Sequence, residues 1–120
     1  MNPEAIAAQT MGDPVNPWIM ETGSVYLWCG LLLAAASLTA KDRRIPLFGL
    51  MLVAGSSGFW QEFFADWGAY LAWNPEFARL PFWGDMAFTT PIKPLFMPFS
   101  WGWWFAVSIP LLTSLVLFLK

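Results

Sequence analysis

Residues 24–40, SVYLWCGLLLAAASLTA, contain no charged side chain, and Lys41, Asp42, Arg43 and Arg44 follow them directly. An uncharged apolar run of this length is near the lower limit for a helix that crosses a bilayer. The charged cluster ends the run, because charges are costly in the hydrocarbon region. The stretch therefore predicts a first transmembrane helix at 24–40, followed by a short basic loop at 41–45.

A second apolar run begins at Pro46, a residue that suits the first turn of a helix. It continues as PLFGLMLVAGSSGFWQEFF over residues 46–64. We expect this transmembrane helix to extend beyond the membrane and to occupy residues 46–73. The small residues in its middle favour close approach of a neighbouring helix, and they are Gly55, Ser56, Ser57 and Gly58.

A third transmembrane helix is predicted at residues 101–119. Its start carries Trp101, Trp103 and Trp104, and tryptophan is enriched at membrane interfaces. Pro110 should kink this helix, which neighbouring helices tolerate within a membrane.

The composition also points to lipid as the solvent. Hydrophobic residues make up 58% of the 120 residues and charged residues 12%, against about 25% charged residues in soluble domains. The sequence predicts an all-α integral membrane protein with about three transmembrane helices. A net charge of −2 argues against nucleic acid, which needs clustered cations. One cysteine and no histidine exclude an intrachain disulfide and histidine-based metal sites, so neither a metal nor a cofactor is expected.

The remaining segments form a tail at 1–23 and a Pro/Trp-rich loop at 74–100. We expect an ordered loop, because disordered linkers are poor in aromatic residues. Lys and Arg concentrate on the cytoplasmic side of membrane proteins, so the 41–45 loop is assigned to the cytoplasm. The tail and the 74–100 loop are then extracytoplasmic, and the chain is a multi-pass protein of a membrane, with a bacterial plasma membrane as the expected location.

Three residues stand out as candidates for catalysis: Glu62, Asp66 and Tyr70. Positions four residues apart on a helix share one face. A carboxyl near the outer edge of a membrane helix faces a bundle interior or a cavity in most proteins. Burial and a like-charged neighbour favour its protonated form, which is the form that a general acid needs. The same two acids also fit a structural arrangement in which both reach water at the outer surface.

Aromatic and amide side chains around these acids form a second candidate set. They are typical of a pocket for a flat, lipophilic ligand, and equally of an interfacial aromatic belt. The residues that we expect to bind the ligand are Gln61, Trp67, Trp73, Asn74 and Trp83.

The order of residues in WQEFFADWGAYLAWNPEFARLPFWGDM (60–86) and TTPIKPLFMPFSWGWWF (89–105) resembles the N-terminal part of the spirocyclase AveC family. The resemblance extends over about residues 46–108, with matching positions at Asp66, Trp67, Tyr70, Asn74, Pro75, Trp83, Pro91 and Pro94. It implies a multi-span membrane protein involved in spiroketal formation, with dehydration of a dihydroxy ketone. Chains of that family are longer, so the resemblance implies that this chain is the N-terminal part of a larger membrane protein.

Two functions from different classes follow. The first is a membrane-embedded acid catalyst that acts on a lipophilic oxygenated molecule, with Glu62 or Asp66 as the proton donor. The second is a non-enzymatic subunit that packs on a larger membrane complex through its Gly-Ser face. Transport within a larger bundle is a third possibility. The expected partners are the lipid bilayer, further membrane helices or subunits, and a lipophilic small molecule.

Overall fold

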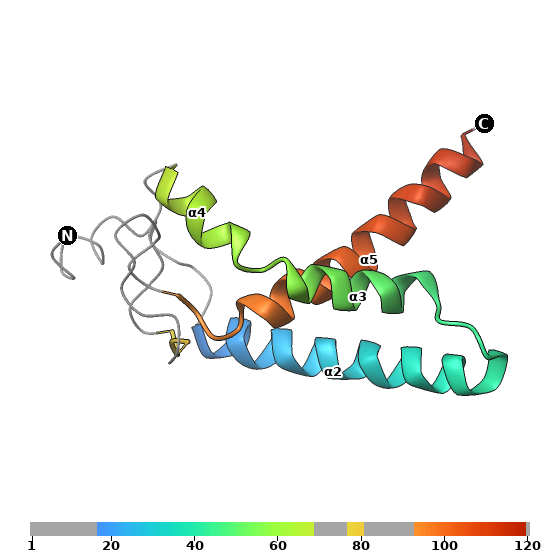
Figure 1. Ribbon diagram of the computed structural model, residues 1–120, viewed down its shortest axis with the longest axis horizontal. Coiled ribbons are helices and arrows are strands. Elements are labelled where there is room, and N and C mark those ends of the chain that lie inside the picture. Colours follow the sequence, from blue (N-terminus) through green and yellow to red (C-terminus); the bar gives the residue numbers. More distant parts are fainter. Residues whose placement is uncertain (1–16, 69–76, 81–92, 120) are drawn as a thin grey trace, which may run out of the picture.

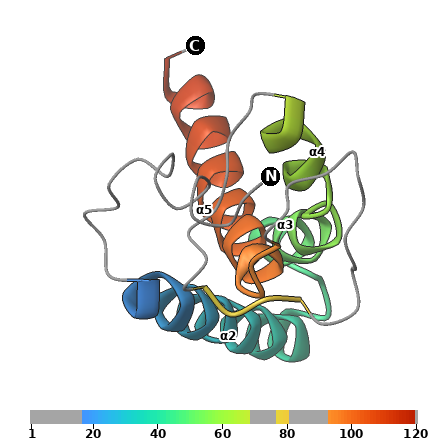
Figure 2. The same cartoon turned by 90° about the vertical axis from the view of Figure 1, so that its left-hand side faces the viewer.

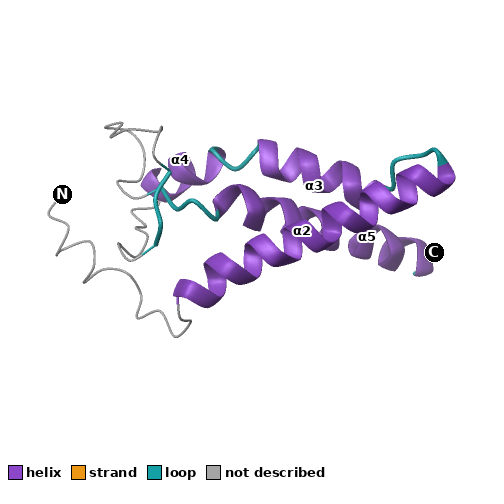
Figure 3. Ribbon diagram, turned by 90° about the horizontal axis from the view of Figure 1, so that it is seen from below, coloured by secondary structure: helices purple, strands orange, loops and turns teal. Residues whose placement is uncertain are grey.

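The computed structural model describes residues 17–68, 77–80 and 93–119. These residues form four helices, α2 (Pro17–Asp42), α3 (Leu47–Ser57), α4 (Gln61–Gly68) and α5 (Met97–Phe118) (Figures 1 and 3). The described part contains no β-strand, only an isolated bridge between Arg79 and Pro94. The predicted all-α class is confirmed.

Helix α2 is longer than the predicted span at both ends. It begins at Pro17, since proline fits the first position of a helix. It ends after Asp42, where Arg43 adopts a left-handed backbone with a φ of 56°. The Arg43 N–H donates to the carbonyl of Thr39 at 2.9 Å, as at many helix ends that close with a left-handed residue. At 26 residues, α2 is about 39 Å long.

The prediction of one helix over 46–73 was wrong, because a turn at residues 58–60 separates α3 from α4. The N–H of Gly58 donates to the carbonyls of Ala54 and Gly55, both at 3.1 Å, and so closes α3. Glycine is about 1 kcal/mol less favourable than alanine inside a helix, and this allows the chain to break here. Helix α4 ends at Gly68, and residues 69–76 lie outside the described part.

Helix α5 begins at Met97, four residues before the predicted span, with proline in its first turn. It continues through Pro110 to Phe118. Residues 97–100 of the predicted 74–100 loop are therefore helical.

The tightest packing is between α3 and α5 (Figure 2). A Cβ atom added to Gly55 would lie 2.5 Å from the Trp101 carbonyl oxygen, and one added to Gly102 would overlap Ser56 Oγ and Trp28 Nε1. The Trp28 indole donates to Ser56 Oγ at 2.8 Å, which joins α2 to the same point. We call the point where Trp28, Gly55, Ser56, Trp101 and Gly102 meet the three-helix crossing.

Close packing at Gly55 is as predicted, but the corresponding prediction for Gly58 was wrong. A Cβ atom added to Gly58 would meet only atoms of Ala54, Gly55 and Gln61, at 3.6–4.0 Å. Gly58 serves the turn rather than a helix contact.

A separate apolar core lies where the described parts of the loop meet the helix ends. Segments 77–80 and 93–96 pair through Leu80 N–H to the Lys93 carbonyl (2.9 Å) and Leu95 N–H to the Ala78 carbonyl (2.7 Å). The core side chains are buried, and they are Phe63, Phe77, Leu80, Phe96 and Met97. These short segments of the loop are thus tied to α4 and to the start of α5.

Two helices, Trp18–Asp42 and Met97–Phe118, are long and apolar enough to cross a membrane. Only 11% of the most apolar window of each is buried within the described structure. Leu47–Ser57 is apolar but has only 11 residues, and at about 16 Å it is shorter than the roughly 30 Å hydrocarbon core.

Candidate functional site

A groove of about 440 Å³ lies among the start of α2, α4 and the first half of α5. Glu62 is the only carboxylate among its described lining residues. Apolar and aromatic side chains make up most of the wall, and they include Met20, Trp101, Trp103 and Trp104. Ser100 contributes one hydroxyl. The groove thus combines one acidic group with a mostly apolar, aromatic surface, as small-molecule sites do.

The Glu62 carboxylate is half-buried and is held in a defined position. The Trp101 indole N–H donates to Glu62 Oε2 at 2.9 Å. Trp101 is itself oriented by stacking on Phe105, one turn later, with ring centroids 5.4 Å apart. Within the described part of the chain, Oε1 of Glu62 has no hydrogen-bond partner. One oxygen is thus anchored, and the other is available to a molecule in the groove.

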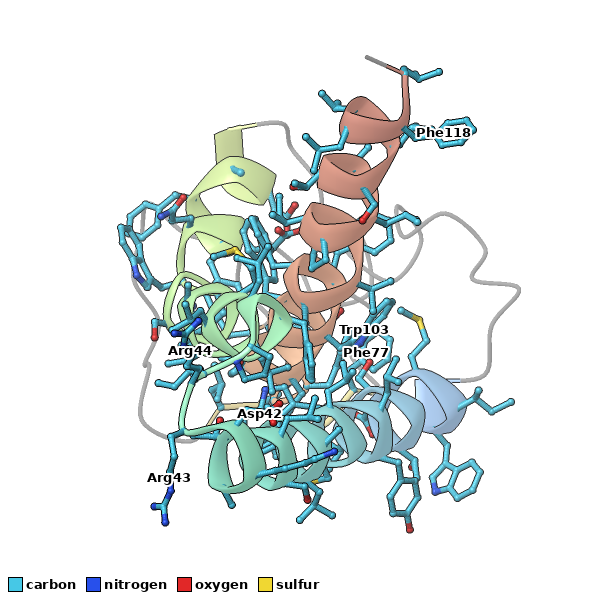
Figure 4. All side chains as sticks on the ribbon, turned by 90° about the vertical axis from the view of Figure 1, so that its right-hand side faces the viewer. Asp42, Arg43, Arg44, Phe77, Trp103 and Phe118 are labelled. Carbon is cyan, nitrogen blue, oxygen red and sulfur yellow. The ribbon has the colours of Figure 1, made fainter. Side chains whose placement is uncertain are left out.

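The tryptophan wall of the groove is fixed by contacts with α2. The Trp103 indole donates to the buried Ser24 hydroxyl at 3.3 Å. Trp104 packs edge-on against Trp103, with ring centroids 5.9 Å apart, and is 60% exposed. Figure 4 shows Trp103 where α5 passes α2. The three tryptophans therefore differ, since two bond across helices and Trp104 does not.

Of the predicted catalytic residues, the structure describes Glu62 and Asp66, and only the first of these two lines the groove. Glu62 lines the groove, whereas Asp66 is 6% exposed and is not among the groove's lining residues. Gln61, predicted to bind ligand, is exposed. Trp67 lies on α4, but its side chain is outside the described part, as are the predicted residues Tyr70, Trp73, Asn74 and Trp83.

Among the described residues, the aromatic side chains near Glu62 on the turn and on α4 lie outside the groove. Phe63 is fully buried in the loop core, and Trp60 is 44% exposed with its ring edge-on to Phe64. The groove instead takes its rings from α5, where the sequence indicated only an interfacial anchor. Trp101 and Phe105 are four residues apart and share one face of α5, but the sequence holds no signal that pairs that face with Glu62.

A second groove of about 430 Å³ contains Glu21 and Tyr26 of α2 together with Leu95 and Phe99. The Glu21 carboxylate accepts a hydrogen bond from the backbone N–H of Ala78. This acid is therefore engaged in holding the described loop segment to α2. Among the described residues, no group of three or more His, Cys, Asp or Glu side chains is placed to hold a metal ion.

Comparisons with known proteins find none that is similar to this chain. No family model, no curated protein and no solved structure matches it. The resemblance to the spirocyclase AveC family stays a prediction from the sequence.

Proposed function

We propose that the chain is a multi-pass membrane protein that binds a lipophilic oxygenated molecule beside Glu62 and acts on it by acid catalysis. The observation that supports this is the Glu62 carboxylate in an aromatic groove, with one oxygen anchored by Trp101 and the other unpartnered within the described residues. A carboxyl group so placed has a fixed direction in which to give its proton.

The reaction that we propose, following the family resemblance, is loss of one water from a dihydroxy ketone. One hydroxyl adds to the carbonyl carbon to form a hemiketal. Protonated Glu62 gives its proton to the hemiketal hydroxyl, which leaves as water. The second hydroxyl attacks the resulting oxocarbenium ion, and its proton returns to the Glu62 carboxylate. Indole faces attract cations, so Trp101, Trp103 and Trp104 would stabilise the charged intermediate.

The proposal includes three membrane crossings, with α3 and α4 together making the middle one. The two helices and their turn extend over residues 47–68. A helix break is tolerated at membrane depth where the backbone groups find partners. Here the N–H groups of Gln61 and Glu62 donate to the carbonyls of Gly58 and Phe59, both at 3.2 Å. The basic loop after α2 then lies in the cytoplasm of a bacterial cell.

The orientation is tested by labelling. Asp42→Cys is introduced together with Cys29→Ala, and intact cells are treated with a membrane-impermeant thiol reagent. We expect labelling only after the cells are opened, because the basic loop is assigned to the inside. Labelling of intact cells would reverse the orientation.

Catalysis is tested with the purified protein in nanodiscs and a long-chain dihydroxy ketone, with water loss followed by mass spectrometry. Glu62→Gln keeps the shape and the bond from Trp101 but removes the transferable proton. It should lower the rate above the protein-free background on the order of 10²-fold. Glu21→Gln is the matched control and should keep the rate, because Glu21 lies in the other groove.

The second candidate function is a non-enzymatic subunit of a larger membrane complex. The exposed apolar second half of α5 supports it, since every residue over 111–119 is exposed. Under this function, the wild-type protein shows no water loss above background. It instead co-purifies in fixed stoichiometry with a membrane partner. The substitution Leu112→Arg should disrupt that complex.

A further inference from the structure

A third groove, of about 570 Å³, lies at the other end of the bundle, between the second half of α2 and the start of α3. Its floor is narrow because the two helices nearly touch there. A Cβ atom added to Gly49 would lie 2.9 Å from Ala35 Cβ. Leu32, Ala36 and Val53 add apolar walls. The result is a mostly apolar slot that is open to the surroundings of the protein.

One end of this slot carries a positive charge. Arg43 is among the lining residues, and its backbone is fixed by the left-handed φ and by the bond from its N–H to Thr39. Asp42 and Arg44 flank it in the chain, Lys41 precedes Asp42, and all three side chains are exposed. Figure 4 shows Arg43 and Arg44 extending outward from the loop between α2 and α3. Within the described part of the chain, none of the three cations Lys41, Arg43 and Arg44 forms an ion pair.

We infer that this groove binds an acyl chain of an anionic phospholipid whose phosphate lies against Arg43. The apolar slot fits the chain, and the unpaired arginine at its end complements a negatively charged headgroup. The inference rests on the proposed membrane location.

Another explanation is that the basic loop only sets the orientation of the protein in the membrane. In that case the three cations are interchangeable, and the slot plays no part in lipid binding. If the lipid binds in the slot, Arg43 and Lys41 should differ in their effect on binding, because Arg43 lines the slot and Lys41 does not. Binding in the slot should also depend on the volume of the slot.

The test titrates the detergent-purified protein with dioleoyl phosphatidylglycerol or dioleoyl phosphatidylcholine and counts bound lipids by native mass spectrometry. The anionic lipid should bind at least about fivefold more tightly than the zwitterionic one. Arg43→Gln should weaken its binding about fivefold, since one basic residue near an anionic surface contributes on the order of 1 kcal/mol. Lys41→Gln should have a smaller effect.

The volume of the slot is tested with Ala36→Phe, which fills it without changing charge. Binding of phosphatidylglycerol should fall, whereas Ala34→Phe should leave it unchanged. Ala34 is also exposed on α2 but does not line the groove.

Three results would overturn the inference: equal binding of the two lipids, equal effects of Arg43→Gln and Lys41→Gln, or unchanged binding in Ala36→Phe. Conversion of a dimer to a monomer by Ala36→Phe would also overturn it, because a second copy would then fill the slot. Failure of the protein to fractionate with membranes would instead refute the membrane location.

Discussion

The two halves of α5 have nearly the same apolar character but very different surroundings. In the first half, Gly102 and Ala106 are buried and four residues apart, and Ser56 of α3 lies directly against Gly102. In the second half, every residue from Leu111 to Leu119 is exposed, and Phe118, at 86% exposure, points away from the bundle (Figure 4). Hydrophobicity alone therefore does not bring these helices together. Small residues let the helix backbones approach closely, as they also do in bundles of transmembrane helices.

The polar groups of α5 follow the same division. In the first half, the indoles of Trp101 and Trp103 donate to Glu62 and Ser24 on other helices. Farther along, the hydroxyls of Ser108 and Thr113 donate to carbonyls of α5 itself, at 2.7 and 2.9 Å. The second half therefore presents apolar side chains and satisfied hydroxyls, which suits contact with lipid or with other apolar helices.

The largest effect is expected from adding bulk at the three-helix crossing. Gly55→Leu places a side chain against the Trp101 backbone, which cannot move without displacing α5. We expect destabilisation on the order of 4 kcal/mol or more, seen as loss of the folded peak in size-exclusion chromatography in detergent. Gly30→Leu is the control, because a Cβ atom at Gly30 meets nothing within 4 Å. Similar yields of the two variants would show that the crossing does not hold the bundle together.

A smaller loss is expected when a buried side chain of α3 is truncated. Leu52 is fully buried, and Leu52→Ala should destabilise the protein by about 3 kcal/mol, through lost burial and the cavity left behind. Leu50→Ala on the same helix, where Leu50 is 48% exposed, should cost far less. Thermal unfolding in detergent measures both, and equal midpoints would contradict the packing of α3 described above.

Removing a single hydrogen bond at the crossing should have a modest effect. Trp28→Phe keeps an aromatic ring but loses the N–H that donates to Ser56. We expect a loss of about 1 kcal/mol, as for other hydrogen bonds between helices. Trp104→Phe serves for comparison, since the Trp104 indole N–H has no partner among the described residues. An equal shift in both variants would mean that the bond contributes nothing.

The smallest effect belongs to the exposed half of α5. Leu115 is 51% exposed, so Leu115→Ala should change stability in detergent by no more than about 0.5 kcal/mol. Thermal unfolding is again the measurement. A loss comparable to that of Leu52→Ala would show that this half is packed in solution, for example against a second copy of the chain.

The sequence predicted the bodies of the two long helices because uncharged apolar runs have few other stable environments. It misplaced their ends, since Pro17 and Pro98 fit the first turn as well as they fit a loop. The break at 58–60 was missed, because glycine is tolerated within many membrane helices.

The candidate site was predicted only in part, for a similar reason. Glu62 was identified as an acid near the edge of an apolar helix. Its partner Trp101 lies 39 residues away, and no local pattern reports a contact over that separation. The sequence also paired Glu62 with Asp66 by helical spacing, but spacing says nothing about which of two acids the surrounding segments cover.

The hydrogen bond between Trp28 and Ser56 has a consequence for biosynthesis. Both partners precede α5 in the chain, so the bond between α2 and α3 can form while α5 is still in the ribosome. The surface that receives Gly102 is made by those two side chains. N-terminal parts of a chain generally fold first during synthesis, so α5 would follow α2 and α3 and dock on the hairpin that they form. In this order of assembly, α5, which carries the aromatic wall of the Glu62 groove, would complete that groove.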